Sequence, residues 1–156
     1  MSRFTDDPKR NAQIMLAIRD REEDLVKMAE DLAQNLANIF RQEEEKPLSE
    51  KNHKERQLRN IQEVAEQSTS WAEVELFIRY QAARKEIYAT WADTAIQKLK
   101  DLETIARSIV GTADESAIRK VHLELIRRVL GYTVRWHVWH AKGEPKLKQA
   151  QQGGGQ

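Results

Sequence analysis

The sequence contains no cysteine, and only three prolines and six glycines interrupt its 156 residues. Without cysteine, disulfides and thiolate metal sites are excluded, and the redox compartment is left open. No apolar run approaches the roughly 18 residues that a membrane span needs, and the first ten residues lack the apolar segment of a signal peptide. We therefore expect a soluble, cytoplasmic protein with no membrane contact.

The sequence also lacks the alternating apolar pattern of β-strands and any repeat of about 30 to 50 residues. Apolar residues recur instead at spacings of three and four, which is typical of amphipathic helices. The length corresponds to one domain. We expect an all-α fold: a compact bundle of about five helices over residues 1–146, followed by a disordered Gly/Gln-rich tail over residues 147–156.

The first expected helix is long and acidic. Asp7 followed by Pro8 is a helix cap with proline at the first helical position. The apolar spacing then continues from Ile14 to Phe40, which predicts a helix of about 35 residues, roughly 50 Å long at 1.5 Å per residue. A helix of this length packs against several others or reaches a neighbouring subunit. Ser49 is expected to begin the second helix.

Local signals mark the remaining helices. Ser70 with Glu73 forms a capping box that opens the third helix. A fourth helix is expected over about residues 85–111 and ends at a glycine, a common carboxyl-terminal stop. Thr112 with Glu115 forms a second capping box, which opens the fifth helix.

The third helix is apolar on two sides. One face carries most of its large residues, while Leu76 and Tyr80 fall almost opposite. Such a helix is enclosed either by its own bundle or between the bundle and a second protein. Arg79 follows Glu75 by four residues, which predicts an ion pair along the helix.

Positive charge is concentrated in the carboxyl-terminal third. Residues 116–148 hold eight Lys and Arg against two Asp and Glu, whereas residues 1–50 hold eight against twelve. On the fifth helix the cations gather within an arc of roughly 100° opposite the apolar side. They are Lys120, Arg127, Arg128, Arg135 and Lys142. Glu124, which interrupts this arc, is placed to pair with Arg128.

A stripe of one sign suits the phosphates of a nucleic acid, which are contacted without reading sequence. Trp139 lies beside the stripe and is placed to stack on a base. No zinc finger, RRM or KH motif accompanies it. A solvated face, an acidic protein partner or the chain's own acidic first helix are the alternatives.

The sequence gives little indication of catalysis or metal binding. It has no Gly-rich phosphate loop, no GxSxG and no HExxH motif. His137 and His140 have a spacing that two metal ligands can use, but no well-placed carboxylate completes a set. We expect no enzyme activity, no catalytic residues, no metal and no cofactor.

Residues 57–84, QLRNIQEVAEQSTSWAEVELFIRYQAAR, resemble the small, all-helical Csm-type subunit of type III CRISPR effector complexes. In that family a helix with a Leu/Ile-Arg-Asn/Lys motif precedes a helix ending in aromatic-x-Ala-Ala/Gly-Arg. The matching residues here are Leu58, Arg59 and Asn60, then Tyr80, Ala82, Ala83 and Arg84. The match covers about a fifth of the chain, and the long first helix lies outside it.

The resemblance implies a non-catalytic subunit that stacks in copies inside a ribonucleoprotein. Its expected partners are guide RNA, target RNA or single-stranded DNA, other effector subunits and copies of itself. Arg59 and Arg84 are then candidate RNA contacts, as is Lys85. Each has a structural alternative, because Arg59 is placed to pair with Glu63, and Arg84 and Lys85 end a helix where cations complement the helix dipole. The first helix, outside the match, is a candidate subunit contact.

Overall fold

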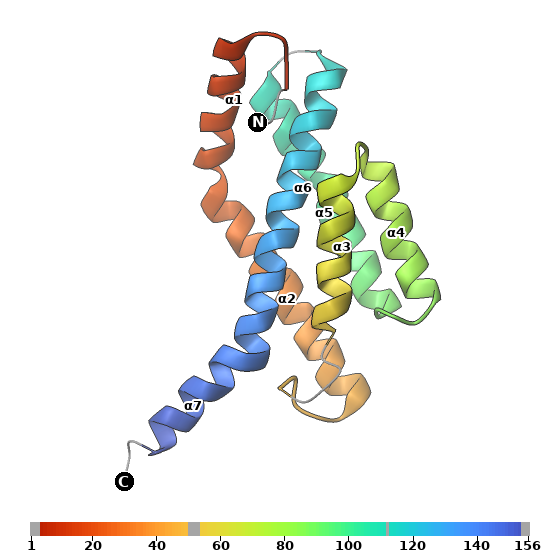
Figure 1. The fold of residues 1–156 in the computed structure, drawn as a ribbon, viewed down its shortest axis with the longest axis vertical. Helices are drawn as coiled ribbons and strands as arrows, with labels where there is room; N and C mark the ends of the chain where they lie inside the picture. Colours follow the sequence, from red (N-terminus) through yellow and green to blue (C-terminus); the bar gives the residue numbers. More distant parts are fainter. Residues whose placement is uncertain (1–3, 50–53, 112, 154–156) are drawn as a thin grey trace.

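The computed structural model describes residues 4–49, 54–111 and 113–153, in which helices are joined by short loops and no strand occurs (Figure 1). The prediction of an all-α fold is confirmed. Seven α-helices and one π-helical turn occur in this part of the chain, where about five helices were expected. They are α1 (Pro8–Asp20), α2 (Glu22–Glu44), α3 (Glu55–Gln67), α4 (Trp71–Ala83), α5 (Ala89–Val110), α6 (Glu115–Val138), the turn η1 (Trp139–Gly143) and α7 (Glu144–Gly153).

The single long helix predicted at the amino-terminal end is wrong, because the chain breaks at Arg21 into α1 and α2. Residues 19–24 are all charged, so no apolar side chain anchors this turn to the core between Ile18 and Leu25. The Arg21 N–H donates to Ile18 O at 3.0 Å, a bond between residues three apart that closes a tighter turn than the α-helical bond between residues four apart. Three acidic residues then occupy the first turn of α2, where they favour a new helix start.

The α2 helix belongs to the core of the molecule. Its apolar stripe, which includes Leu25, Leu32 and Leu36, is fully buried, and α2 packs along α6. The buried indole of Trp91 on α5 also donates to Leu32 O at 2.9 Å. The apolar side of α2 is therefore satisfied within the chain.

The second helix begins later than expected. Ser49 lies in a turn, residues 50–53 lie outside the described residues, and α3 starts at Glu55 after the left-handed Lys54 (φ 73°). Leu48, next to Ser49, is buried in a small cluster with Phe40 and Ala141. This contact holds the α2–α3 connection against the bundle.

Two of the predicted helix ends are confirmed. The Glu73 N–H donates to Ser70 Oγ at 3.4 Å at the start of α4, and Gly111 ends α5 in the left-handed conformation at φ 70°. The other two differ. The α5 helix begins at Ala89 because Lys85 is left-handed (φ 62°). The start of α6 is capped by Asp114, which accepts from Ala117 N–H at 3.1 Å; Thr112 of the expected box lies outside the described residues.

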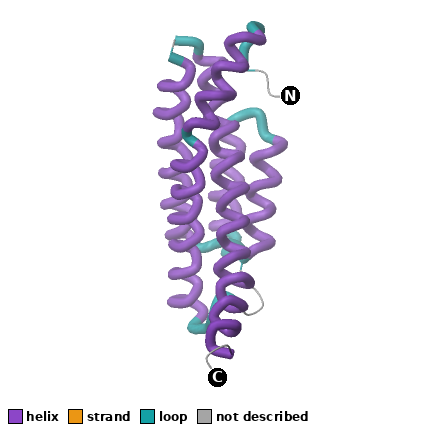
Figure 2. The backbone as a smooth tube through the Cα atoms, turned by 90° about the vertical axis from the view of Figure 1, so that its left-hand side faces the viewer, coloured by secondary structure: helices purple, strands orange, loops and turns teal. Residues whose placement is uncertain are grey.

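The central helix of the bundle is α6, and α2, α3 and α5 pack around it (Figures 1 and 2). Figure 2 shows that the helices run roughly along one long axis. Buried residues occur on almost every side of α6, including Leu123, Ile126, Leu130 and Val134, which fall outside the predicted apolar side. The polar arc of α6 is therefore narrower than the sequence indicated.

The two sides of α4 are as predicted. Val74, Ile78 and Gln81 are buried, whereas Leu76 and Tyr80 are 69% and 52% exposed. The predicted ion pair is present, with Arg79 Nε 3.1 Å from Glu75 Oε2.

The expected disordered tail over residues 147–156 is not seen in the described residues, because α7 continues as a helix to Gly153. Residues 154–156 lie outside the described part. The backbone runs from α6 through η1 into α7 without a break, and the Glu144 carboxylate pairs with both His140 (3.0 Å) and Lys148 (3.3 Å). The α7 helix projects from the bundle (Figure 1) and buries no side chain among its described residues.

None of the helices in the described residues combines the length and the apolar character that crossing a membrane requires.

Candidate nucleic-acid interface

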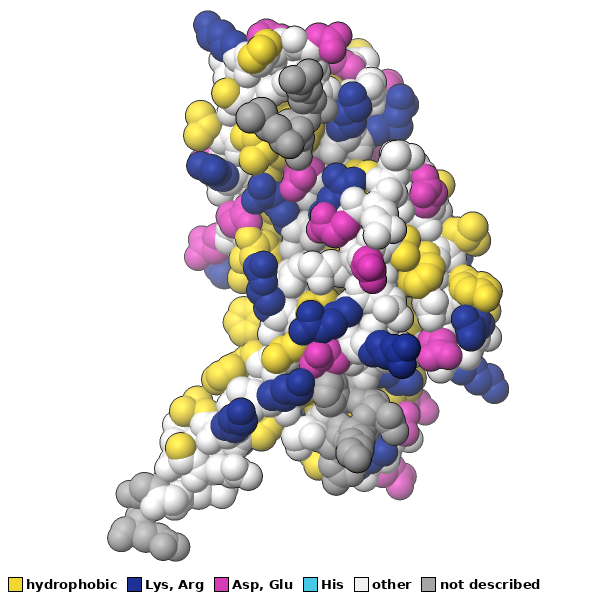
Figure 3. All heavy atoms as spheres, in the orientation of Figure 1, with side chains coloured by type: hydrophobic (Ala, Val, Ile, Leu, Met, Phe, Trp, Pro, Cys, Tyr) yellow, Lys and Arg dark blue, Asp and Glu magenta, His cyan; other side chains and the backbone are white. Residues whose placement is uncertain are grey.

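The seam between α3 and α6 brings together six of the eight cations of the predicted site. Shallow hollows follow this seam, and their linings include Lys120, Arg127, Arg128, Arg135 and Lys142 from the carboxyl-terminal half and Arg59 from α3. Figure 3 shows Lys and Arg side chains along this face, over the seam and on toward α7, with fewer acidic groups between them. We call this surface the α3–α6 face.

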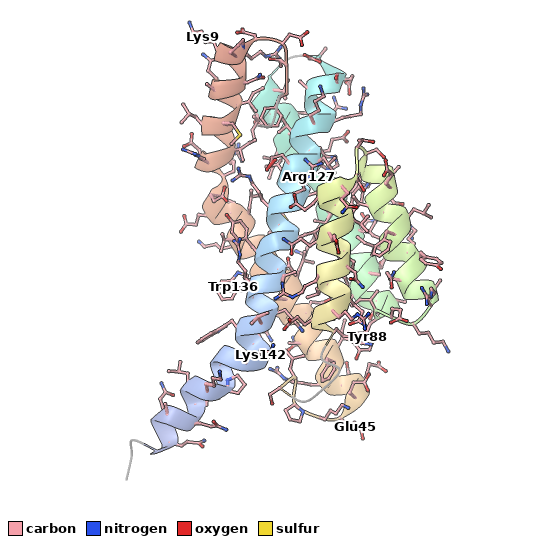
Figure 4. The ribbon with its side chains drawn as sticks, viewed as in Figure 1. Lys9, Glu45, Tyr88, Arg127, Trp136 and Lys142 are labelled. Atoms are coloured by element: carbon pink, nitrogen blue, oxygen red, sulfur yellow. The ribbon has the colours of Figure 1, made fainter. Side chains whose placement is uncertain are left out.

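The Arg127 side chain has a structural role. Its Nε donates to Ala65 O and its Nη2 to Ser68 O, both at 2.9 Å, so it satisfies carbonyl groups at the carboxyl end of α3. Its side chain points toward α3 in Figure 4. These two bonds give Arg127 a structural role and leave its guanidinium less capacity for a phosphate, and the RNA contact of Arg127 stays a prediction.

Arg128 is engaged as well. Its Nη1 lies 2.9 Å from Glu22 Oε2 on α2, and its Nε lies 3.1 Å from Glu124 Oε2. The Tyr132 hydroxyl donates to the same Glu22 carboxylate. The predicted pairing with Glu124 is confirmed. Glu22, in the acidic amino-terminal region, also neutralises this part of the stripe, which agrees with the alternative that the chain's own acidic first helix pairs with it.

Arg59 and Arg135 come together from different helices. They line one hollow of about 470 Å³ with Gln62, Gly131, Val134 and Val138. Both side chains are exposed. Arg59 Nε lies 3.1 Å from Glu55 Oε2 rather than beside Glu63, and the Arg135 guanidinium lies 5.3 Å from the centre of the Tyr132 ring. These contacts orient the two guanidinium groups while leaving them accessible to solvent.

Lys142 extends the face past the end of α6, and the labels in Figure 4 place it beyond Trp136 along the chain. Its Nζ lies 3.2 Å from Glu55 Oε1, although the side chain remains 55% exposed. Burial alone would raise the pKa of Glu55, but hydrogen bonds and charge from Arg59 and Lys142 outweigh it and lower that pKa. Glu55 therefore stays ionised and fixes two cations at the edge of the seam.

Lys120 lies at the other end of the face. It is exposed and lines a hollow of about 240 Å³ beside Phe4, Ser68 and Thr69. None of the contacts described above involves the Lys120 ammonium group. Lys120 is therefore a predicted contact that the structure leaves accessible.

The hollows along the α3–α6 seam do not include Arg84 and Lys85. Both lie after the end of α4 and are exposed; the Arg84 guanidinium lies 5.4 Å from the centre of the Tyr80 ring. They belong to the outer edge of α4 and not to the α3–α6 face.

Sequence reasoning missed Gln62 and Gly131. They line two neighbouring hollows of the seam, and a Cβ at position 131 would meet Gln62 Nε2 at 3.3 Å. The glycine itself is the sequence signal for this close approach. A glycine inside a helix lowers helix stability, so its presence there indicates that a neighbouring group needs the space of a side chain.

The two histidines considered as metal ligands are not arranged as a metal centre. His137 is fully buried, whereas His140 lies 3.0 Å from Glu144 and stacks on Trp136 at 6.1 Å. Across residues 4–49, 54–111 and 113–153, no group of three or more His, Asp or Glu could hold a metal ion.

Comparisons with known proteins give no relative: no family model matches this chain, and neither a curated protein nor a solved structure matches it.

Proposed function

We propose that this protein is a non-catalytic RNA-binding subunit that holds the nucleic-acid backbone on its α3–α6 face without reading sequence. The observation that carries the proposal is the meeting of Arg59 and Arg135 in one hollow, with Lys142 and Lys120 at the two ends of the α3–α6 face. Single-stranded nucleic acid is held by such basic grooves, because cations that neutralise phosphates release bound counterions.

The resemblance of residues 57–84 gives the proposal its biological setting, a small subunit of a type III CRISPR ribonucleoprotein in the cytoplasm. Its partners would be guide RNA, target RNA or single-stranded DNA, larger effector subunits and further copies of the chain. Arg59 belongs to the matching motif and also lies on the α3–α6 face. Arg84, the other cation of the motif, lies apart from this face at the end of α4, and its RNA contact stays a prediction.

The proposal is tested by reversing the two exposed cations whose side chains support no other helix. Lys120→Glu with Arg135→Glu should weaken binding to labelled single-stranded RNA at least tenfold while leaving helicity unchanged. Lys100→Glu is the control, because Lys100 is an exposed lysine on α5, away from this face. Binding that is equal in all three proteins would contradict the proposal.

A second function, as a helical module that binds only protein, is favoured by α4. Leu76 and Tyr80 are one helical turn apart and both exposed, and Arg84 lies against the tyrosine ring. If the protein binds only protein, Leu76→Ser with Tyr80→Ser should abolish assembly, whereas Lys120→Glu with Arg135→Glu should not affect it. The parent protein should then show no binding to labelled single-stranded RNA, which distinguishes this function from the first.

A further inference from the structure

Trp139 is unusual among the tryptophans of this chain. It is 41% exposed, whereas Trp91 is fully buried and Trp71 and Trp136 are half-buried against the core. The Trp136 indole donates to Val26 O at 3.1 Å and thus faces α2. Trp139 stands three residues later, in the π-helical turn η1 that joins α6 to α7. Such turns often occur at functional sites.

Gly143 makes room for the Trp139 ring. A Cβ added at position 143 would lie 2.2 Å from Trp139 Cε3 and 2.7 Å from Cζ3, distances that real atoms do not adopt. The benzene half of the indole therefore occupies the space that a side chain at 143 would fill. The ring is held against the backbone on this side, and the exposed remainder is oriented before any ligand arrives.

Cations flank the ring along the same stretch of helix. Arg135 lies four residues before Trp139 and Lys142 lies three residues after it, so both are neighbours on the helix surface. Lys142 is positioned by Glu55 at 3.2 Å and Arg135 by the Tyr132 ring at 5.3 Å. An aromatic ring between two oriented cations matches a nucleotide, which presents a flat base beside negative phosphates.

We infer that Trp139 is a stacking platform for a nucleobase of single-stranded RNA whose phosphates contact Arg135 and Lys142. This inference rests on the proposed function and adds a contact to the bases that is independent of their identity. Any base presents a π-face, so a stacking tryptophan preserves sequence-independent binding. The platform also distinguishes an RNA with bases from its bare sugar-phosphate backbone.

The test compares Trp139→Leu with the parent protein on two ligands of equal length, oligoadenylate RNA and an abasic ribose-phosphate oligomer. Loss of one stacked base should weaken binding to oligoadenylate by roughly 5-fold to 100-fold. Binding of the abasic oligomer should not change. Arg135→Ala should weaken binding to both ligands.

Equal effects of Trp139→Leu on the two ligands, or no effect on either, would overturn the inference while leaving backbone binding intact. Absence of binding by the parent protein would instead overturn the proposed function.

A second pair of variants tests the role of Gly143 with the tryptophan retained. Gly143→Ala should displace the ring and weaken oligoadenylate binding alone. Gly153→Ala is the matched control, because an added Cβ there meets nothing within 4 Å. Far-UV circular dichroism checks that both variants remain helical. Parent-like binding of oligoadenylate by Gly143→Ala would contradict the placement of the ring by this glycine.

Discussion

The guanidinium of Arg127, on α6, closes the carboxyl end of α3: its Nε lies 2.9 Å from the carbonyl oxygen of Ala65, 62 residues earlier in the chain. A second bond, to Ser68 O, is equally short. One side chain of the predicted basic stripe thus joins the two helices that form the α3–α6 face.

This relationship predicts that Arg127→Ala destabilises the fold. The carbonyl groups of two buried residues, Ala65 and Ser68, lose a charged donor, which should lower the free energy of unfolding by roughly 1 to 3 kcal/mol. Urea unfolding followed by circular dichroism measures the change. Lys120→Ala, two turns earlier on α6 and exposed, is the control and should cost less than about 0.5 kcal/mol. Equal stability of the two variants would contradict the capping role of Arg127.

Glu22 and Glu23 are adjacent but should differ in importance. Glu22 contacts Arg128 and Tyr132 in a partly buried site, whereas Glu23 only faces Lys27 at 3.8 Å with both side chains largely exposed. We expect Glu22→Ala to lower the free energy of unfolding by roughly 1 to 3 kcal/mol and Glu23→Ala by less than about 1 kcal/mol. Thermal melts of both variants provide the comparison, and a reversed order would show that Glu22 does not join α2 to α6.

Buried His122 should make the stability depend on pH. Burial lowers its pKa, against smaller opposing effects from the Leu99 carbonyl, 2.9 Å from Nε2, and from Glu103. Below about pH 6.5, His122 therefore binds a proton more readily in the unfolded chain than in the folded chain. The free energy of unfolding falls as the pH drops through this range.

His122→Gln isolates this effect, because a glutamine amide retains a donor for Leu99 O but does not titrate. The loss of stability between pH 7.5 and pH 5.5, measured by urea unfolding, should be smaller in His122→Gln than in the parent protein. An identical loss in both proteins would assign the pH dependence to other groups.

Local sequence signals predicted much of the fold. The serine cap at Ser70 and the glycine stop at Gly111 depend on neighbouring residues only, and both were predicted correctly. The break at Arg21 was missed because the helical spacing of apolar residues resumes at Leu25, although residues 19–24 contribute nothing to the core.

The candidate site was harder to predict, because a helical wheel gives the direction of a side chain but not what lies opposite it. Arg127 and Arg128 point outward from the apolar side of α6 and then meet α3 and α2. Their partners are 62 and 106 residues away in sequence. Only the packing of α6 at the centre of the bundle separates these structural cations from accessible ones such as Lys120 and Arg135.

The central claim, backbone recognition on the α3–α6 face, is tested most directly by the salt dependence of RNA binding. Fluorescence anisotropy with single-stranded RNAs of unrelated sequence gives the binding constant over a series of salt concentrations. If Arg59, Lys120, Arg135 and Lys142 each neutralise one phosphate, log K should fall against log salt with a slope of about −3, the same for every sequence. Arg135→Ala should make this slope shallower by roughly 0.7. A slope near zero, or one that differs between sequences and is unaffected by Arg135→Ala, would contradict backbone recognition by this face.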